Sequence, residues 1–313
     1  MTETESSTTA DSNDELWLSV RCVLNQADGQ RLTQALDDIP GILPGMAGYY
    51  ELLYDESRPQ QDTTAIIIYF DLAVAQPAIQ LELLLAALQI EQFEIQQESV
   101  KRLDYMQAYK EYYQAQQISR RFHIVPSWLW SEWQAPDPDS MPLVLDPGLA
   151  FGTGQHPTTQ LCLEFLDEHP PVDQSLIDAG CGSGILSLGA LLCQARSVYA
   201  FDIDSNAILA TRQNIAMNQD RITGSLLVEQ GGFELARLDT IQCDLLLGNL
   251  TASILVQNLE GLNRIATQRI LLSGIIQHQL EFVLQNLENI WTLQEHKERD
   301  GWQLLYLERK TIA

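Results

Sequence analysis

Apolar and polar positions alternate in two different ways along the chain, and the change falls near residue 142. Before it, "LWLSVRCVL", "GYYELLYD", "TTAIIIYFDL" and "FEIQQESV" have the β-branched and aromatic content of strands. "DGQRLTQALDD" and "QPAIQLELLLAALQ" have the spacing of helices. The order strand–helix–strand–strand–helix–strand predicts a ferredoxin-like α+β domain over residues 16–99.

From residue 142 to residue 313, short apolar strands alternate with amphipathic or apolar helices. The strand candidates are "SLIDAG", "SVYAFDID", "SLLVEQ", "CDLLLGNL" and "RILLSGI". This alternation is typical of a doubly wound α/β sheet. The end of the chain, "WTLQEHKERDGWQLLYLER", predicts two further strands that pair antiparallel across "RDG".

Two segments lie outside these domains. Residues 1–15, "MTETESSTTADSNDE", are polar and acidic and predict a disordered tail. Residues 100–141 predict an interdomain helix, over 100–120, and a linker with the proline-rich stretch "QAPDPDSMP". The helix carries Tyr105, Tyr109 and either Tyr112 or Tyr113 on one stripe, which suits either packing or contact with a ligand.

The charge of the chain restricts the kinds of molecule that it is expected to bind. With 42 acidic against 18 basic residues, the net charge of −24 disfavours free nucleic acid and favours a basic partner, although acidity also serves solubility. No apolar run approaches the ~20 residues of a membrane span. The five cysteines form no CxxC pair and the five histidines are dispersed, so we expect reduced thiols, a cytoplasmic location and no metal site.

A glycine-rich loop follows the strand that ends at Asp178. Its glycines are Gly180, Gly182 and Gly184, and Ile185 stands where the third glycine of a dinucleotide fold would fall. This GxGxG pattern resembles class I S-adenosylmethionine-dependent methyltransferases. Glycines let the backbone approach a ligand, and the following helix N-terminus offers N–H groups to a carboxylate. A plain tight turn is the alternative.

Two side chains at later strand ends add to this pattern. Asp202 ends the next strand, where a carboxylate can accept both ribose hydroxyl protons. Asp204 or Ser205 then caps the following helix, and a role for both acids as caps alone stays open. Asn249 ends "LLLGN", at the edge where open α/β sheets place ligands.

The residues after Asn249 bear on the substrate. Methyltransferases of amide or adenine nitrogens tend to carry Asn-Pro-Pro-aromatic here, whereas this chain has Leu250, Thr251 and Ala252, without a ring. The pattern therefore favours an aliphatic amine.

The stretch "LDPGLAFGTGQHPTTQLCLEFL", residues 145–166, closely resembles the signature of the PrmA family, which methylates protein eleven of the large ribosomal subunit. "FDID", "GNLTA" and "LLSGII" follow in the family's order, and the resemblance covers about residues 100–310. It implies a class I methyltransferase Rossmann-like sheet, S-adenosyl-L-methionine as cofactor, and methyl transfer to lysine or α-amino groups of a basic ribosomal protein. We expect a monomer.

The resemblance also implies the site. It places Thr159, Gly180, Asp202 and Asn249 in contact with the cofactor, and Gly182 and Gly184 complete the loop. Asn249 is also the expected catalytic residue, because it would orient the amine. Upstream, Gly148, Gly152 and Gly154 predict a mobile loop near Phe151, and Pro157 suits the first turn of a helix in which Thr158 and Thr159 either meet the cofactor or cap the helix.

Some residues depart from the family pattern. Tyr105 and Tyr109 stand where tryptophans are usual, Tyr113-Gln114-Ala115 replaces a Phe-His-Pro-like triplet, and Thr251 replaces an apolar residue. A PrmA-like paralogue that methylates another protein therefore remains an alternative. An NAD-dependent oxidoreductase is disfavoured by Ile185, and a binding module without turnover is disfavoured by Asp202 and Asn249.

Overall fold

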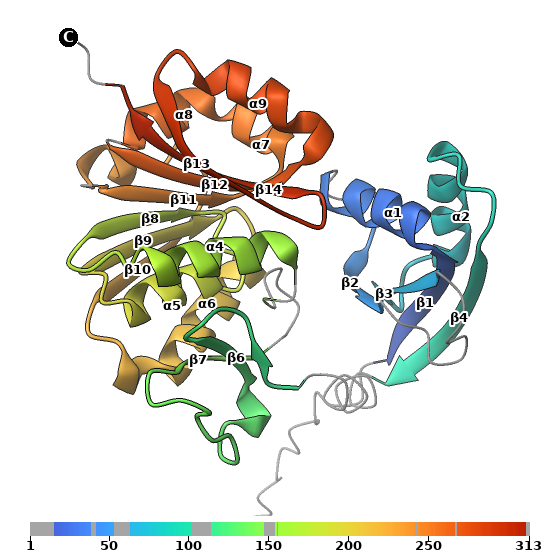
Figure 1. The fold of residues 1–313 in the computed structure, drawn as a ribbon. Helices are drawn as coiled ribbons and strands as arrows, with labels where there is room; N and C mark the ends of the chain where they lie inside the picture. The colour runs from blue at the N-terminus through green and yellow to red at the C-terminus, as the bar shows by residue number, and fades with distance from the viewer. Residues whose placement is uncertain are drawn as a thin grey trace, which may run out of the picture. The chain divides into compact units, whose positions relative to one another are not determined.

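The computed structural model describes residues 16–38, 42–52, 63–101, 114–146, 154, 156–241, 243–266 and 268–310. The chain forms two compact units, Met1–Tyr113 and Gln114–Ala313 (Figure 1). Each unit has its own sheet and its own hydrophobic core.

The N-terminal unit has the predicted order of elements. They are β1 (Leu16–Asn25), α1 (Gln26–Asp38), β2 (Met46–Leu52), β3 (Thr63–Asp71), α2 (Pro77–Ala87) and β4 (Glu94–Lys101). The strands form an antiparallel sheet in the order β2-β3-β1-β4. This arrangement confirms the ferredoxin-like fold of this unit.

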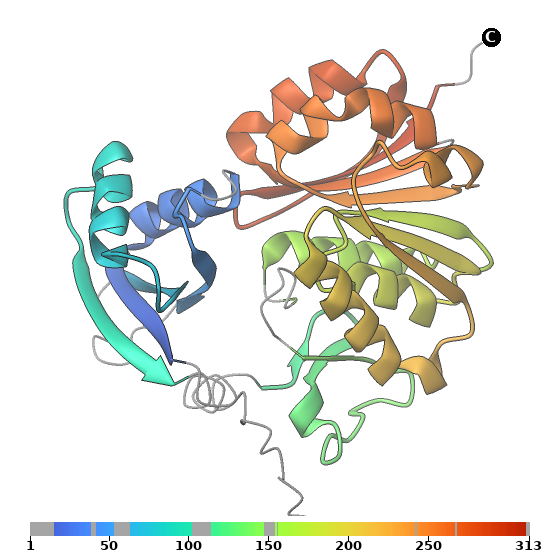
Figure 2. The same cartoon turned by 180° about the vertical axis from the view of Figure 1, so that it is seen from behind.

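Both helices of the N-terminal unit pack on one face of its sheet (Figure 2). The alternate residues Val20, Cys22 and Leu24 of β1 point into that core, as the period of a strand requires. Leu32 of α1 and Leu81 of α2 are fully buried against them. Burial of these side chains therefore holds the helices on the sheet.

The C-terminal unit is built on a seven-stranded sheet in the order β10-β9-β8-β11-β12-β14-β13. The strands are β8 (Ser175–Ala179), β9 (Ser197–Asp202), β10 (Ser225–Gln230), β11 (Leu245–Asn249), β12 (Arg269–Ile276), β13 (Trp291–Arg299) and β14 (Trp302–Arg309). The first five in the sheet are parallel, and the β13–β14 hairpin adds antiparallel strands at one edge. All five predicted strands and the predicted hairpin are confirmed.

Helices cover both faces of this sheet (Figure 1). Leu245 and Leu247 of β11 lie in one core with α4 (Pro157–Glu168), α5 (Ile185–Leu192) and α6 (Ser205–Met217). Leu246 lies in the other core with α7 (Ala252–Gln257), α8 (Leu259–Ile265) and α9 (Leu280–Leu287). The strands read as continuous apolar runs because both faces are buried.

Residues that the sequence assigned to a linker form part of the C-terminal unit. The strands β5 (Gln116–Gln117), β6 (Phe122–Pro126) and β7 (Met141–Leu145) form a small sheet, and η2 (Ser127–Leu129) follows β6. The units divide after Tyr113, not at residue 142, because Phe122 and Ile124 are buried in the core of α4 and α5. The prediction of a helix over 100–120 is wrong at both ends, because Lys101 belongs to β4 and Gln116 to β5. The tyrosines of this predicted helix lie outside the described residues.

A buried carboxylate joins the small sheet to α4. Asp167 accepts hydrogen bonds from Ser119 Oγ at 2.7 Å and from the backbone N–H of Arg121 at 2.9 Å. The Arg121 guanidinium also pairs with this carboxylate. The three contacts fix the start of β6 on the end of α4.

All five cysteines are buried and remain in the thiol form, as predicted. Burial raises the pKa of the Cys193 thiol to about 11 and that of Cys22 to about 12. In the described part of the chain, the helices are too short or too polar to cross a bilayer.

Candidate functional site

The glycine loop between β8 and α5 has an unusual backbone. Gly180, Gly182 and Gly184 have φ angles of 71°, 53° and 76°, in the left-handed region that favours glycine. A Cβ on Gly184, which caps α5, would lie 2.7 Å from Thr211 Cγ2. Glycine at this position therefore permits both the turn and the close approach of α6.

Buried polar side chains of α6 hold the loop from behind. Thr211 Oγ1 donates a hydrogen bond to the carbonyl of Gly182 at 2.9 Å, and Asn214 Nδ2 donates one to the carbonyl of Ser183 at 2.8 Å. Thr211 and Asn214 are 0% and 1% exposed. These two bonds fix the backbone of the loop against α6.

Asp202 lies at the carboxyl end of β9 and is bonded to the loop. Its Oδ2 accepts from the Gly182 N–H at 2.9 Å, and its Oδ1 accepts from the Asp204 N–H at 3.0 Å. Of the two candidate caps, Asp204 is the N-cap of α6, where it accepts from the Asn206 N–H at 2.9 Å. The structure thus brings Asp202 to the glycine loop and separates its role from that of Asp204.

Asp178 ends the strand before the loop and is 1% exposed. It accepts from Ser187 Oγ at 2.6 Å and from the Ser187 N–H at 3.1 Å, which satisfies a donor in the first turn of α5. Burial raises the pKa of the Asp178 carboxyl to about 6; the Ser187 bonds oppose this shift and the Asp202 charge adds to it. The sequence showed an aspartate here but not this function.

Asn249 and Thr159 meet at the same edge of the sheet. The Nδ2 of Asn249, at the end of β11, donates to Thr159 Oγ1 at 3.4 Å, although the residues are 90 positions apart. Thr159 belongs to the first turn of α4 and is 1% exposed. Two residues predicted for one site are therefore neighbours.

The N-cap of α4 is His156, which sequence reasoning missed. Its Nδ1 lies 2.8 Å from Thr158 Oγ1 and accepts from the Thr158 N–H at 3.4 Å. Pro157 occupies the first turn, as predicted. The edge of the His156 ring meets the Trp302 ring, with centroids 4.6 Å apart. Since His156 is the N-cap, the cap position is not occupied by Thr158 or Thr159.

The cap of α4 should depend on pH. Burial lowers the pKa of His156 from 6.5 to about 4, so below pH 6.5 the unfolded chain takes up a proton that the folded chain excludes. We expect His156 to destabilise the fold progressively as pH falls from 6.5 to 4, by up to about 3 kcal/mol in total. The measurement is urea unfolding of the wild type and of His156→Asn, which retains a capping side chain.

The comparison between these two proteins isolates His156. The raised pKa of Asp178 acts in the opposite direction, because its stabilising contribution is lost as pH rises from 3.8 to about 6. That contribution is common to both proteins and cancels in their difference. A difference in unfolding free energy that stays constant between pH 7 and pH 4 would contradict a buried neutral His156.

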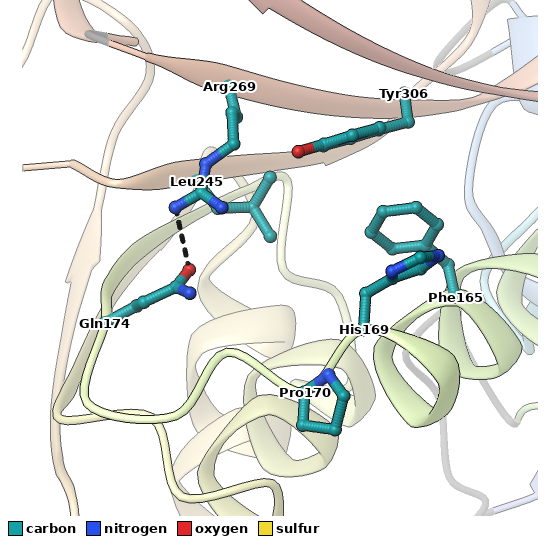
Figure 3. A pocket seen from close by; sticks show the side chains of 7 residues that line it. All are labelled: Phe165, His169, Pro170, Gln174, Leu245, Arg269 and Tyr306. Carbon is teal, nitrogen blue, oxygen red and sulfur yellow. Dashed lines mark hydrogen bonds between the residues drawn. The ribbon is translucent and has the colours of Figure 1, made fainter. Parts of the chain in front are cut away.

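A cavity of about 210 Å³ lies at the opposite edge of the sheet (Figure 3). Leu245 and Arg269, the first residues of β11 and β12, contribute to its wall. The Arg269 guanidinium already donates to Gln174 Oε1 at 3.0 Å and to the Asp244 carbonyl at 3.2 Å. The cavity is thus separate from the glycine loop. Its lining residues are Phe165, His169, Pro170, Gln174, Leu245, Arg269 and Tyr306.

Near that cavity, Glu168, His169 and Glu295 bring ligand atoms within 4.8 Å of one another. Lys297 forms ion pairs with Glu168 and, at 3.2 Å, with Glu295. Its ammonium group already supplies the positive charge, so an ion-pair cluster accounts for the arrangement.

The family model described as ribosomal protein L11 methyltransferase (PrmA) matches residues 16–310. The chain belongs to the PrmA family. This confirms the resemblance found in residues 145–166 and extends it through the N-terminal unit. The glycine loop, Asp202 and Asn249 thus belong to a PrmA-family methyltransferase.

Two similar proteins carry the name of the matched family. The ribosomal protein L11 methyltransferase of Hydrogenovibrio crunogenus is 35% identical over 75% of this chain and 79% of its own. The protein of the same name from Leptospira interrogans is 30% identical over 90% of this chain and 95% of its own.

A solved structure also resembles the chain. The ribosomal protein L11 methylase of Lactobacillus delbrueckii subsp. bulgaricus is 30% identical, with a TM-score of 0.55, over 64% of this chain and all of its own. This likeness confirms the class I methyltransferase fold. Phe151, Gly148 and Gly152 of the predicted mobile loop lie outside the described residues.

Proposed function

We propose that this protein transfers methyl groups from S-adenosylmethionine to lysine or α-amino groups of ribosomal protein L11. The observation that carries the proposal is the PrmA match over residues 16–310. The meeting of Asn249 with Thr159, and of Asp202 with Gly182, at the carboxyl edge of the sheet supports it.

The residues of the loop fit the proposed cofactor. A carboxylate at the end of β9 suits two ribose hydroxyls, and backbone N–H groups at the start of α5 suit the carboxylate of the methionine end. Gly180 and Gly182 adopt left-handed φ angles that favour glycine, and this tight turn would let the loop backbone approach the ligand. We assign Thr159, Gly180, Gly182, Gly184, Asp202 and Asn249 to this binding site.

The chemistry asks little of the protein beyond alignment. The sulfonium of S-adenosylmethionine supplies a methyl group that is already activated. Asn249 would orient an amine by accepting a hydrogen bond from its N–H on Oδ1, since the Asn249 Nδ2 donates to Thr159. A lysine amine, with a pKa near ~10.4, must first lose a proton, and burial in the cleft favours its neutral form.

The substrate class follows from charge and from the residues after Asn249. A chain of net charge −24 attracts a basic protein and repels free nucleic acid. Leu250 and Thr251 offer no ring on which a base could stack. We propose a cytoplasmic monomer that acts on a basic ribosomal protein.

Intact-mass analysis of ribosomal proteins from cells with and without this gene tests the function. We expect ribosomal protein L11 to lose mass in steps of one methyl group when the gene is deleted, and to regain it with the purified protein and S-adenosylmethionine. A shift confined to another protein would instead support a paralogue with a different substrate. No shift in any protein would contradict the proposal.

Asp202→Ala should weaken binding of S-adenosylmethionine by about 1–3 kcal/mol, because ribose hydroxyls and two backbone N–H groups lose their acceptor. Titration calorimetry measures this loss. Asp202→Asn, which keeps one oxygen, should fall between the alanine variant and the wild type. Asp220→Ala removes an exposed carboxylate as a control for charge. If Asp202→Ala binds S-adenosylmethionine as tightly as the wild type, Asp202 is not part of the site. NADH is expected not to bind to the wild type.

A further inference from the structure

Strand β12 contains a bulge beside the candidate site. Its register with β14 shifts between Leu272 and Ile275, so that Ser273 and Gly274 together face Leu304. Gly274 has a φ angle of 82°, in the left-handed region. Two residues opposite one, with a left-handed glycine, form a β-bulge that redirects the strand.

The bulge is in direct contact with the backbone of Leu250, the residue after Asn249. The Leu250 N–H donates to the Ser273 carbonyl at 3.1 Å. A Cβ on Gly274 would lie 2.3 Å from the carbonyl oxygen of Leu250 and 2.7 Å from its carbonyl carbon. Backbone atoms cannot rotate away as a side chain does, so any residue other than glycine must shift the Leu250 backbone or the bulge relative to each other.

Leu250 in turn connects the bulge with both halves of the site. Its Cδ2 would lie 2.4 Å from a Cβ on Gly180, which places its side chain against the glycine loop. Asn249 pairs with Ser273 in the register of β11 and β12, and its Nδ2 reaches Thr159 Oγ1. A displacement of Leu250 is therefore passed to the Asn249 side chain.

A buried polar network fixes the bulge from the other side. Ser273 Oγ donates to the Gln303 carbonyl at 2.8 Å, and both residues are 0% exposed. The Gln303 side chain donates to Gln277 Oε1 at 2.8 Å, and its Oε1 lies 2.6 Å from His296 Nε2. With its polar atoms bound in this way, the bulge resists a shift along the strand.

We propose that Ser273 and Gly274 are positioning residues for methyl transfer. The bulge sets the path of the Leu250 backbone and so directs the Asn249 side chain at the amine. This inference rests on the proposed function. It assigns to β12 a part in catalysis that does not depend on contact with either substrate.

Gly274→Ala tests the proposal in the full-length protein. We expect kcat to fall about tenfold or more, because small misplacements of an orienting group slow a reaction strongly. The KM for S-adenosylmethionine should change by a smaller factor than kcat, since Asp202 and Gly182 are held by β9 and α6. Rates are measured per folded molecule, with the folded fraction taken from circular dichroism.

A second glycine variant separates this effect from a general loss of stability. Gly224→Ala introduces crowding, because its Cβ would lie 2.1 Å from the Ala195 carbonyl at the opposite edge of the sheet. It should retain a kcat within about twofold of wild type per folded molecule.

Ser273→Ala provides a variant that adds no atom. It removes the bond to the Gln303 carbonyl, and we expect kcat to fall about threefold or more with KM unchanged. If Gly274→Ala does not fold, Ser273→Ala alone decides: a wild-type kcat overturns the proposal. The proposal is also overturned if Gly224→Ala shows the same loss of kcat as Gly274→Ala. If the wild-type protein methylates no ribosomal protein, the proposed function and the positioning role are both overturned. If the wild type is active and the variants are equally active, only the positioning role is overturned.

Discussion

Replacing Asn249 with alanine is expected to slow methyl transfer about 100-fold, because the amine then lacks the group that aligns it with the methyl donor. Asn249 lies at the carboxyl end of β11 and is held by Thr159, so the loss concerns orientation and not folding. Single-turnover rates with saturating S-adenosylmethionine measure the effect. Affinity for the cofactor should fall less than the rate.

The control for this variant is Asn286→Ala. Asn286 is exposed on α9, where its Nδ2 donates to the Phe282 carbonyl, so the substitution removes the same atoms far from the glycine loop in sequence. It should retain the wild-type rate. An Asn249→Ala rate within about twofold of wild type would remove the orienting role.

A chain that begins at Gln114 should bind S-adenosylmethionine with nearly full affinity and lose methylation of the protein substrate. The glycine loop, Asp202 and Asn249, which we assign to the cofactor site, all belong to the C-terminal unit. We therefore propose that the N-terminal unit recognises the protein substrate. Calorimetry and methyl incorporation into ribosomal protein L11 are the two measurements.

The start of this shortened chain matters. Beginning at Gln114 keeps β5 and the Ser119–Asp167 bond, which a start at Arg121 would remove. Methylation at the full-length rate would contradict recognition by the N-terminal unit. Loss of both cofactor binding and methylation would assign it a stabilising role instead.

The sequence predicted those parts of the fold and site that depend on local pattern. The strands of the large sheet are short apolar runs because both of their faces are buried, and such runs are visible without a structure. The same holds for the glycine loop, whose three glycines are required by backbone conformation at Gly180, Gly182 and Gly184. Asp202 and Asn249 could be proposed as site residues from the sequence because each ends a predicted strand.

Residues that act through tertiary contacts were not predicted. His156 precedes a proline and gives no capping signal of the usual Ser, Thr, Asp or Asn kind. Ser187 matters only because Asp178, on another element, reaches it. The strand character of "FHIVP" is visible in the sequence. Its parallel pairing with β7 was not predicted, because a proline-rich loop separates the two strands. One sequence feature could have indicated how α6 holds the glycine loop. It is the pair of polar residues Thr211 and Asn214, three positions apart on a helix that otherwise packs against the core.

The buried cysteines give each unit its own chemical reporter. A thiol reacts with an alkylating reagent as the thiolate, and burial both shields these five sulfurs and raises their pKa values. Labelling must then wait for local opening or global unfolding of the surrounding core. Cys22 belongs to the N-terminal unit, and the other four cysteines belong to the C-terminal unit. Peptide mapping of labelled cysteines over time would therefore time the opening of the two units separately within one intact molecule.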